Sequence, residues 1–243
     1  MTNENKSVII SKPTLAILKN FASISGNILL QKDEEYLKIM SPLKNLYGHA
    51  KIAERFPQEF SIIELSSFIE MLRLFDNDEI ILTFEGEYVI ISNPTGTSGF
   101  KFYQTDKKFL QVNEKPYREL PAVETFSLPC QVLQTIQRAD SIIGGSENVL
   151  TFKGENGKLH AIVSDKKDRS NIATNNFKSE LGTTEHNFEI LIKTENLKVL
   201  PRDYTGHIVL DPNNNQPKVL RLIDKDNTLI YTIAVEVNST YEK

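Results

Sequence analysis

The chain has 243 residues, of which 40% are hydrophobic and 25% charged, with a formal net charge of −4 and a pI of about 5.7. This length allows one or two domains, and no apolar run is long enough to span a bilayer. The acidic balance argues against a protein that coats nucleic acid with an overall basic surface, although basic residues could still gather on one face. Cys130 is the only cysteine, which excludes an intrachain disulfide and favours a reducing cytoplasm. The polar start of the chain lacks the basic-then-apolar order of a signal peptide.

The first predicted helix follows a short strand at 7–10. Ser11 and Pro13 form a helix-entry signal, and the helix is expected to extend from about residue 14 to residue 23. At 100° per residue, one side of this helix is apolar and carries Leu15, Leu18, Phe21 and Ala22. Lys12 and Lys19 lie on the opposite side. Alternating or apolar stretches then predict strands at 27–31, 36–40, 47–53, 88–92 and 100–104.

A second entry of the same kind, Ser127 to Pro129, precedes a helix expected over about 130–143, and Gly144 ends it. The residues expected to point inward are Val132, Leu133, Ile136 and Ile143. Gln134 and Arg138 lie on the opposite face. Further strands are expected at 148–153, 158–164, around 171–177, and at 218–223 and 229–237.

Two stretches of the chain share one pattern at a fixed offset of 128 residues: 60–82 and 188–210. Apolar positions coincide throughout, and Ser66 coincides with Thr194. Each copy predicts a strand, a hydroxyl N-cap, a short helix and a second strand. Two copies at about half the chain length indicate a duplicated domain.

The predicted domains are 1–108 and 127–243, joined by an extended connector at 109–126 that contains Pro116 and Pro121. Each half would contain two helices and several antiparallel strands. The economical arrangement is an α+β fold with the helices on one face of antiparallel sheet. The outer side of these helices would then form a surface.

Basic residues recur at equivalent places on that surface in the two halves. Lys193, Lys198 and Arg202 surround the short helix of the second copy, and Arg73 lies at the flank of its counterpart. Such side chains contact phosphate groups without reading base identity. A solvated helix face is the more frequent explanation for any one helix, and the recurrence in two halves is what favours phosphate contact.

Catalytic and metal sites are not indicated. The four histidines are scattered, and the sequence contains no Cys-x-x-Cys, no nucleotide-binding glycine motif and no G-x-S-x-G. The lone thiol of Cys130 fits packing beneath a helix better than nucleophilic chemistry. No cofactor is expected.

Several segments resemble one family in order along both halves. Residues 15–22, LAILKNFA, look like the opening helix of the T-even-type bacteriophage sliding clamps, which are replication processivity factors. The other matching segments are 64–69, 196–198 with Pro201 and Tyr204, and 234–240.

The resemblance implies the DNA-clamp fold, with two similar domains, antiparallel sheets on the outside and two helices per domain on the inner face. It implies a homotrimeric ring that encircles duplex DNA and tethers the DNA polymerase, which raises the local polymerase concentration. The residues that would face DNA are Lys12, Lys19, Arg73, Gln134, Arg138, Lys193, Lys198 and Arg202. The edge strands that would join subunits are expected at 100–104 and 159–164.

The resemblance also implies an apolar groove for partner peptides at the connector, involving Leu120, Pro121 and Val123, although ordinary packing of the connector would explain these residues too. The implied partners are the polymerase, a clamp loader and, in some relatives, transcription factors, in the cytoplasm of an infected bacterial host. The alternative function is an oligomeric peptide-binding adaptor that does not encircle DNA. An enzyme ranks last.

Overall fold

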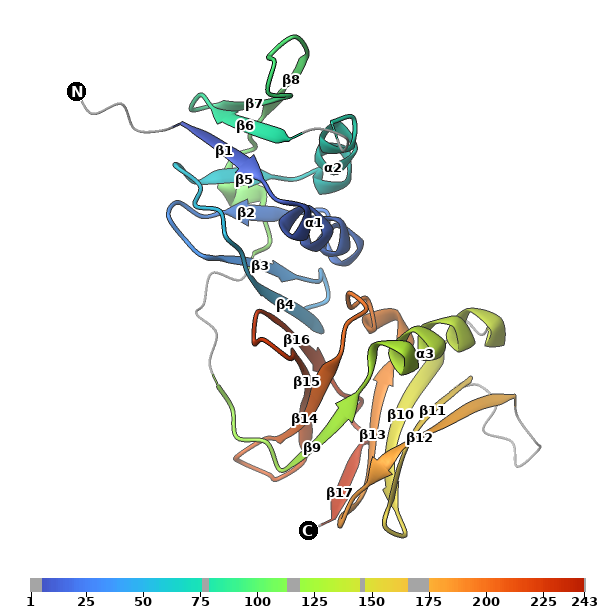
Figure 1. Ribbon diagram of the computed structural model, residues 1–243. Coiled ribbons are helices and arrows are strands. Elements are labelled where there is room, and N and C mark those ends of the chain that lie inside the picture. Colours follow the sequence, from blue (N-terminus) through green and yellow to red (C-terminus); the bar gives the residue numbers. More distant parts are fainter. Residues whose placement is uncertain (1–5, 76–78, 113–118, 145–146, 166–174, 243) are drawn as a thin grey trace. The chain divides into compact units, whose positions relative to one another are not determined.

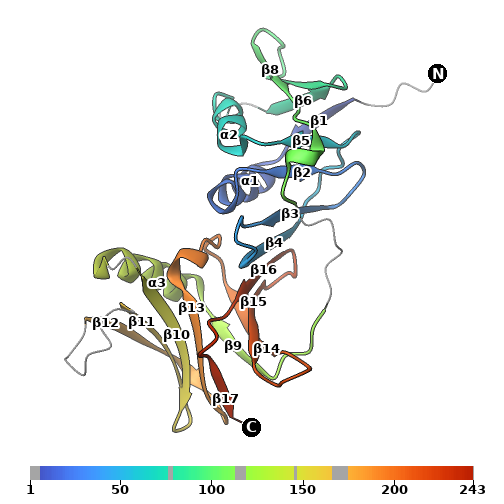
Figure 2. The same ribbon diagram turned by 180° about the vertical axis from the view of Figure 1, so that it is seen from behind.

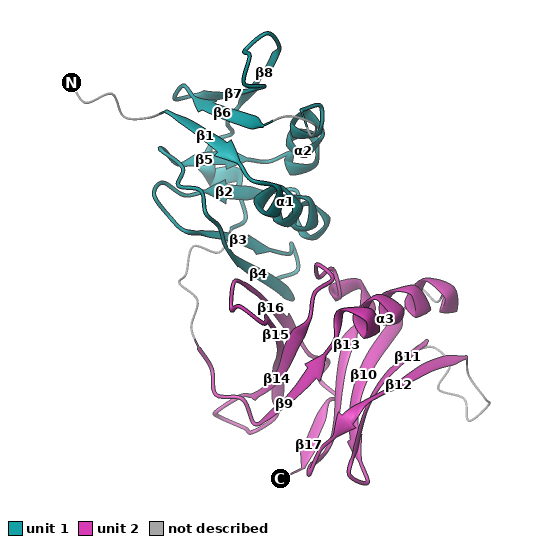
Figure 3. Cartoon of the chain, in the orientation of Figure 1, with its two compact units in different colours: residues 1–117 teal, residues 118–243 magenta. Residues whose placement is uncertain are grey.

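The structure is a computed structural model that describes residues 6–75, 79–112, 119–144, 147–165 and 175–242. The chain divides into two compact units, residues 1–117 and 118–243 (Figure 3). The division falls within the stretch expected to be the connector. The end of that stretch already belongs to a strand of the second unit, β9 (Glu124–Leu128).

Unit 1 is built from short strands, two α-helices and one 3-10 turn in its described residues (Figure 1). In chain order they are β1 (Ser7–Ile10), α1 (Lys12–Ile24), β2 (Ile28–Leu30), β3 (Tyr36–Met40), β4 (Leu46–Lys51), β5 (Phe60–Ile62), α2 (Leu65–Arg73), β6 (Ile80–Phe84), β7 (Tyr88–Ser92), β8 (Gly99–Tyr103) and η1 (Lys107–Phe109). The main sheet has the order β1-β6-β7-β8 and is antiparallel throughout. β2 pairs with β5, and β3 pairs with β4, both antiparallel.

The helices of unit 1 bury their apolar sides as the sequence predicts. α1 begins after Ser11, whose hydroxyl accepts a hydrogen bond from the Thr14 amide, and it buries Leu15, Leu18 and Phe21. α2 packs against β8 through edge-on ring contacts, with Phe68 against Phe102 at 5.1 Å between centroids. α1 and α2 also contact each other.

Unit 2 has longer strands and, in its described residues, one α-helix (Figure 2). Its elements are β9, α3 (Cys130–Ile143), β10 (Asn148–Glu155), β11 (Lys158–Asp165), β12 (Asn176–Thr183), β13 (Asn187–Lys193), η2 (Thr194–Asn196), β14 (Tyr204–Leu210), β15 (Pro217–Asp224), β16 (Leu229–Ala234) and β17 (Thr240–Glu242). One sheet has the order β12-β11-β10-β13-β17. In the other, β14 lies between β9 and β15, and β15 pairs with β16.

α3 crosses one face of the first of these sheets and contacts β11 and β12. It ends at Gly144, whose φ of 68° places it in the left-handed region that favours glycine. α3 begins at Cys130 as the sequence predicts, but its capping group is not the one that the entry signal suggests. Ser127 lies within β9, and the amide of Cys130 donates instead to the carboxylate of Asp203 at 2.8 Å. A residue 73 positions away therefore caps this helix.

The predicted strand around 171–177 is displaced toward the C-terminus, since the described strand β12 begins at Asn176. Residues 171–174 lie outside the described part of the chain. Most of the other predicted strands are present with bounds shifted by one or two residues, and 36–40 and 88–92 match β3 and β7.

The repeated pattern at 60–82 and 188–210 folds in two different ways. The first copy forms β5, α2 and β6, but α2 begins at Leu65, so Ser66 lies inside the first turn and is not the cap. The second copy forms β13, the single 3-10 turn η2 and β14, so the expected helix is wrong. Thr194 donates its hydroxyl hydrogen bond to the carbonyl of Asn148 and does not cap a helix. Pro201 further disfavours helical backbone at the residue before it.

The expectation that the strand at 159–164 is a sheet edge is also wrong. It is β11, which pairs with β10 on one side and with β12 on the other. Among the described residues, the outermost strand on that side is β12. The other expected edge, at 100–104, corresponds to β8, which pairs only with β7 in its sheet.

Candidate nucleic-acid interface

A hollow between α1 and α2 gathers two of the predicted DNA-facing cations in unit 1. The cavity has a volume of about 470 Å³, and both Lys19 and Arg73 line it. Both are exposed, since they lie on the sides of their helices that face away from the core. Arg73 also forms an ion pair with Glu70 one turn earlier, at 2.9 Å, so its charge is partly compensated.

The N-terminus of α1 is already occupied by an acidic side chain. The buried carboxylate of Glu54 accepts hydrogen bonds from the Ser11 amide at 2.7 Å and from the Thr14 hydroxyl at 2.6 Å. This negative charge complements the positive end of the helix dipole. A phosphate group near α1 would consequently be bound through exposed side chains such as Lys12, and not through the first amides of the helix.

The polar side of α3 and the loop after η2 are held together in unit 2. The Gln137 side-chain amide donates to the carbonyls of Leu197 and Val199, each at 3.3 Å. Lys198, between them in sequence, is exposed, as is Arg138 on α3. The structure therefore joins the two segments that carry these cations. Gln134, on the same helix, is half-buried.

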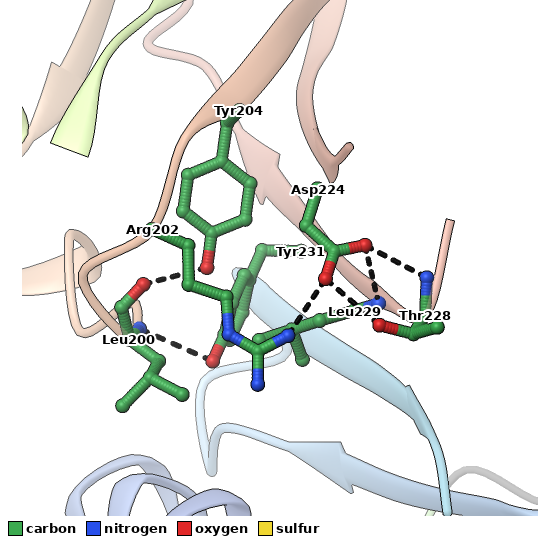
Figure 4. Close-up of polar contacts among 7 residues, drawn as sticks. All are labelled: Leu200, Arg202, Tyr204, Asp224, Thr228, Leu229 and Tyr231. Atoms are coloured by element: carbon green, nitrogen blue, oxygen red, sulfur yellow. Dashed lines mark hydrogen bonds and ion pairs between the residues drawn. The ribbon is translucent and has the colours of Figure 1, made fainter. Parts of the chain in front are cut away.

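The remaining two predicted cations lie beside carboxylates. Lys193 is 3.7 Å from Glu195, and both side chains are exposed, so this pair is weak. Arg202 is different, because its guanidinium lies 2.7 Å from Asp224, whose side chain is only 4% exposed (Figure 4).

A network of buried and half-buried polar groups surrounds that ion pair, as Figure 4 shows. Asp224 also accepts hydrogen bonds from the Thr228 amide and hydroxyl and from the Leu229 amide. Tyr204 donates its hydroxyl hydrogen bond to the Leu200 carbonyl at 2.6 Å, and the Leu200 amide donates to the Tyr231 hydroxyl. Burial raises the pKa of both tyrosines, so both keep their protons.

The residues predicted to form a peptide groove are fastened to the sheets of unit 2 through their backbone. Leu120 accepts from the Arg221 guanidinium, whereas Val123 donates to Ile208 and accepts from the Tyr241 hydroxyl. Both side chains are half-buried, and that of Pro121 is exposed.

Leu43 and Phe109 are among the large apolar side chains that are exposed in unit 1. Leu43 is 77% exposed and Phe109 is 61% exposed. The Gln111 side chain donates to the carbonyl of Pro42, which ties the segment after η1 to the turn between β3 and β4. Neither residue belongs to a periodic pattern in the sequence. Their exposure depends on how the turns pack in the folded chain, which a local pattern does not reveal.

Across the described residues, no three His, Cys, Asp or Glu side chains gather in a way that could hold a metal ion. Among the same residues, none of the helices combines the length and apolar character needed to cross a membrane.

Comparisons with known proteins agree with this architecture. No family model matches the chain. The sliding clamp of Vibrio phage KVP40 is 27% identical over 202 residues, which cover 80% of this chain and 87% of the relative. The sliding clamp of Escherichia phage RB69 is 24% identical over 236 residues, covering 96% and 99%.

The chain is similar to phage sliding clamps. The resemblance to T-even-type clamps read from the sequence is thus confirmed. Among solved structures, the A. fulgidus PCNA bound to the C-terminal region of FEN-1 matches with a TM-score of 0.64 at 13% identity, covering 96% of this chain and 99% of that one. At this identity the match shows the fold, and the predicted DNA-clamp fold is confirmed.

Proposed function

We propose that the chain is a sliding clamp, which closes with two further copies into a ring around duplex DNA and tethers the replicative DNA polymerase. The observation that carries this proposal is the construction of both units from antiparallel sheet covered by an amphipathic helix, α1 or α3, with exposed cations on its outer side. The similarity to phage sliding clamps over most of the chain supports it. Such a ring acts by topology and needs no catalytic residue.

Contacts with DNA would be weak and independent of sequence. Lys12, Lys19, Arg138 and Lys198 are the exposed cations that we assign to phosphate groups, with Gln134 as a neutral hydrogen-bonding neighbour. Arg73 and Lys193 each lie beside a glutamate, which partly compensates their charges. A few exchangeable phosphate contacts suit a ring that slides, so a chain with a net charge of −4 is compatible with this function.

The ring would close through the open edges of two sheets. β8 and β12 are the outermost strands on one side of their sheets among the described residues. An antiparallel pair between β8 of one copy and β12 of the next would satisfy the unpaired backbone groups of both. Because the two edges differ, the contact is heterologous and forms a closed ring when its rotation suits.

The proposed partners are the DNA polymerase, a clamp loader and, as in some relatives, transcription factors, in the cytoplasm of an infected bacterial host. One partner would bind through a short peptide; in a solved structure of similar fold, the C-terminal region of FEN-1 is bound to A. fulgidus PCNA. We assign Pro121, with Leu120 and Val123, to this contact.

The test is a charge reversal on α1. The double substitution Lys12→Glu with Lys19→Glu should reduce loading on circular duplex DNA and shorten the products of the polymerase, while the trimer persists. The matched control, Lys32→Glu with Lys44→Glu, makes the same charge change at exposed positions of unit 1 that are not part of α1. Processive synthesis as long as that of the wild type with the α1 variant would show that this helix does not face DNA.

A further inference from the structure

Arg202 has a different environment from the other predicted DNA-facing cations. Its side chain is 32% exposed, and its guanidinium donates to a carboxylate that is almost fully buried. The partner, Asp224, lies at the end of β15 and is fixed by the turn that leads into β16. Withdrawing Arg202 to reach a phosphate group would leave a buried charge without its counter-charge, which is costly.

The segment that carries Arg202 has no regular secondary structure of its own. Between η2 and β14, residues 197–203 form no helix or strand. Side chains from surrounding elements replace the missing backbone ladder: Gln137 of α3 binds two carbonyls, and Tyr204 and Tyr231 bind the two polar groups of Leu200. Arg202 adds its ion pair with Asp224, which is drawn in Figure 4.

We infer that Arg202 is a positioning residue: its ion pair with Asp224 fixes the 197–203 segment so that Lys198 is presented beside Arg138 on α3. The inference rests on the proposed function, since it takes Lys198 as a phosphate contact. The loop is anchored near its start by Gln137 and near its end by Arg202, next to Asp203, which caps α3. Lys198 lies between the two residues that Gln137 binds, Leu197 and Val199, and is followed by the stretch that Arg202 fixes, so the position of its ammonium group depends on both tethers.

The test compares two variants with the same charge and different tethers. In Arg202→Gln with Asp224→Asn, the two amides can still hydrogen-bond to each other, and the asparagine oxygen still accepts from Thr228 and Leu229. In Arg202→Ala with Asp224→Asn, the charges are removed in the same way but the tether is lost. Lys198→Gln serves as the reference for loss of the phosphate contact itself.

The readout is how the affinity of the full-length protein for an open-ended linear duplex depends on salt, between about 50 and 200 mM. Each phosphate contact contributes roughly 0.9 to the slope of log K against log salt. If Arg202 positions the segment, the Gln/Asn pair (Arg202→Gln with Asp224→Asn) should keep the wild-type slope. The Ala/Asn pair (Arg202→Ala with Asp224→Asn) should have a slope reduced as in Lys198→Gln. Adding Lys198→Gln to the Ala/Asn pair should then reduce the slope no further.

Direct phosphate contact by Arg202 predicts equal reductions in both paired variants, and this result would overturn the inference. Wild-type slopes in both paired variants would overturn it as well. A wild-type slope for Lys198→Gln alone would show that Lys198 does not contact phosphate and would overturn the inference. It would not bear on the ring or on the α1 contacts, which have their own tests.

Hydrogen exchange provides a readout that does not involve DNA. The amide of Leu200 should exchange faster in the Ala/Asn pair than in the Gln/Asn pair, while the unfolding midpoints of the two remain close. If the Ala/Asn pair does not fold, Tyr204→Phe releases the Leu200 carbonyl without a change in charge and should reduce the salt slope in the same direction. An unchanged slope in Tyr204→Phe with a faster-exchanging segment would contradict the inference.

Discussion

The carboxylate of Glu54 lies 2.6 Å from the hydroxyl of Thr14, in the first turn of the helix that we assign to DNA contact. Its second oxygen accepts from the Ser11 amide. Glu54 is buried, so these hydrogen bonds are shielded from water. A residue 40 positions away in sequence thus fixes the start of α1 and, with it, the position of Lys12.

Replacing Glu54 with glutamine should destabilise the protein by about 1–3 kcal/mol, because the amide nitrogen of glutamine cannot accept a hydrogen bond and one donor would be left buried and unsatisfied. Urea unfolding measures this free energy. Glu59→Gln is the control, since Glu59 is exposed and pairs with Lys107 at the surface, where an ion pair contributes about 0–1 kcal/mol. Equal losses in the two variants would contradict the proposed role of Glu54.

Gly154 is required by close packing between β10 and β13. A Cβ atom at this position would lie 2.6 Å from the carbonyl oxygen of His186 and 2.6 Å from the ring of Phe188. Gly154→Ala should therefore cost about 1–3 kcal/mol of stability in urea unfolding, as overpacked sites do. Gly26→Ala is the comparison, because its Cβ would approach no atom closer than 3.4 Å. A Gly154 variant as stable as the Gly26 variant would show that the strands can separate at little cost.

His49 should make stability depend on pH. Burial, with the nearby charge of Lys38, lowers the pKa of His49 from 6.5 to about 4. Between these two values the unfolded chain binds a proton that the folded chain does not, so this contribution to stability is complete above pH 6.5 and is lost as the pH falls toward 4. Carboxylates also titrate in this range, so the comparison must be made against a variant.

His49→Phe retains an aromatic ring for stacking on Tyr36, which lies 4.5 Å away between ring centroids. The difference in unfolding free energy between this variant and the wild type should shift in favour of the variant on going from pH 7.5 to pH 5. The same difference at both pH values would mean that His49 titrates alike in the folded and unfolded states.

The proposed ring interface can be probed by one substitution on each edge of a single sheet. Tyr103 on β8 and Ile9 on β1 are both exposed, at 61% and 53%, and these strands are the two edges of the main sheet of unit 1. Tyr103→Glu should weaken trimer formation at least about tenfold, which corresponds to about 1.4 kcal/mol, because it places a charge at the contact. Ile9→Glu should leave the trimer intact. Sedimentation over a range of concentrations distinguishes the two, and equal weakening by both would exclude β8 as the specific edge.

The sequence predicted α1 and α3 well because their apolar residues recur at helical spacing, and that spacing reflects the positions that each helix buries. It failed at 194–200, where apolar residues at a spacing of three also suit an irregular segment. The hydrogen bonds of that segment come from Gln137 and Tyr231, which no local pattern reveals. Asp203, which caps α3, was missed for the same reason.

The edge at β11 was mispredicted because edge status depends on whether another strand pairs, and β12 is mostly polar and exposed. The candidate DNA contacts were chosen by residue type on predicted helix faces. The sequence does not show which of them form ion pairs. Arg202 and Lys198 look equivalent in the sequence, and only the burial of Asp224 distinguishes them.

The most direct test of the central claim is the mass and shape of the assembled protein. Light scattering coupled to chromatography, with single-particle images of the same peak, should give about three times the chain mass of 27.6 kDa and a ring with three-fold symmetry and an open centre. A 27.6 kDa monomer at every concentration, or a closed particle without a central opening, would contradict the account.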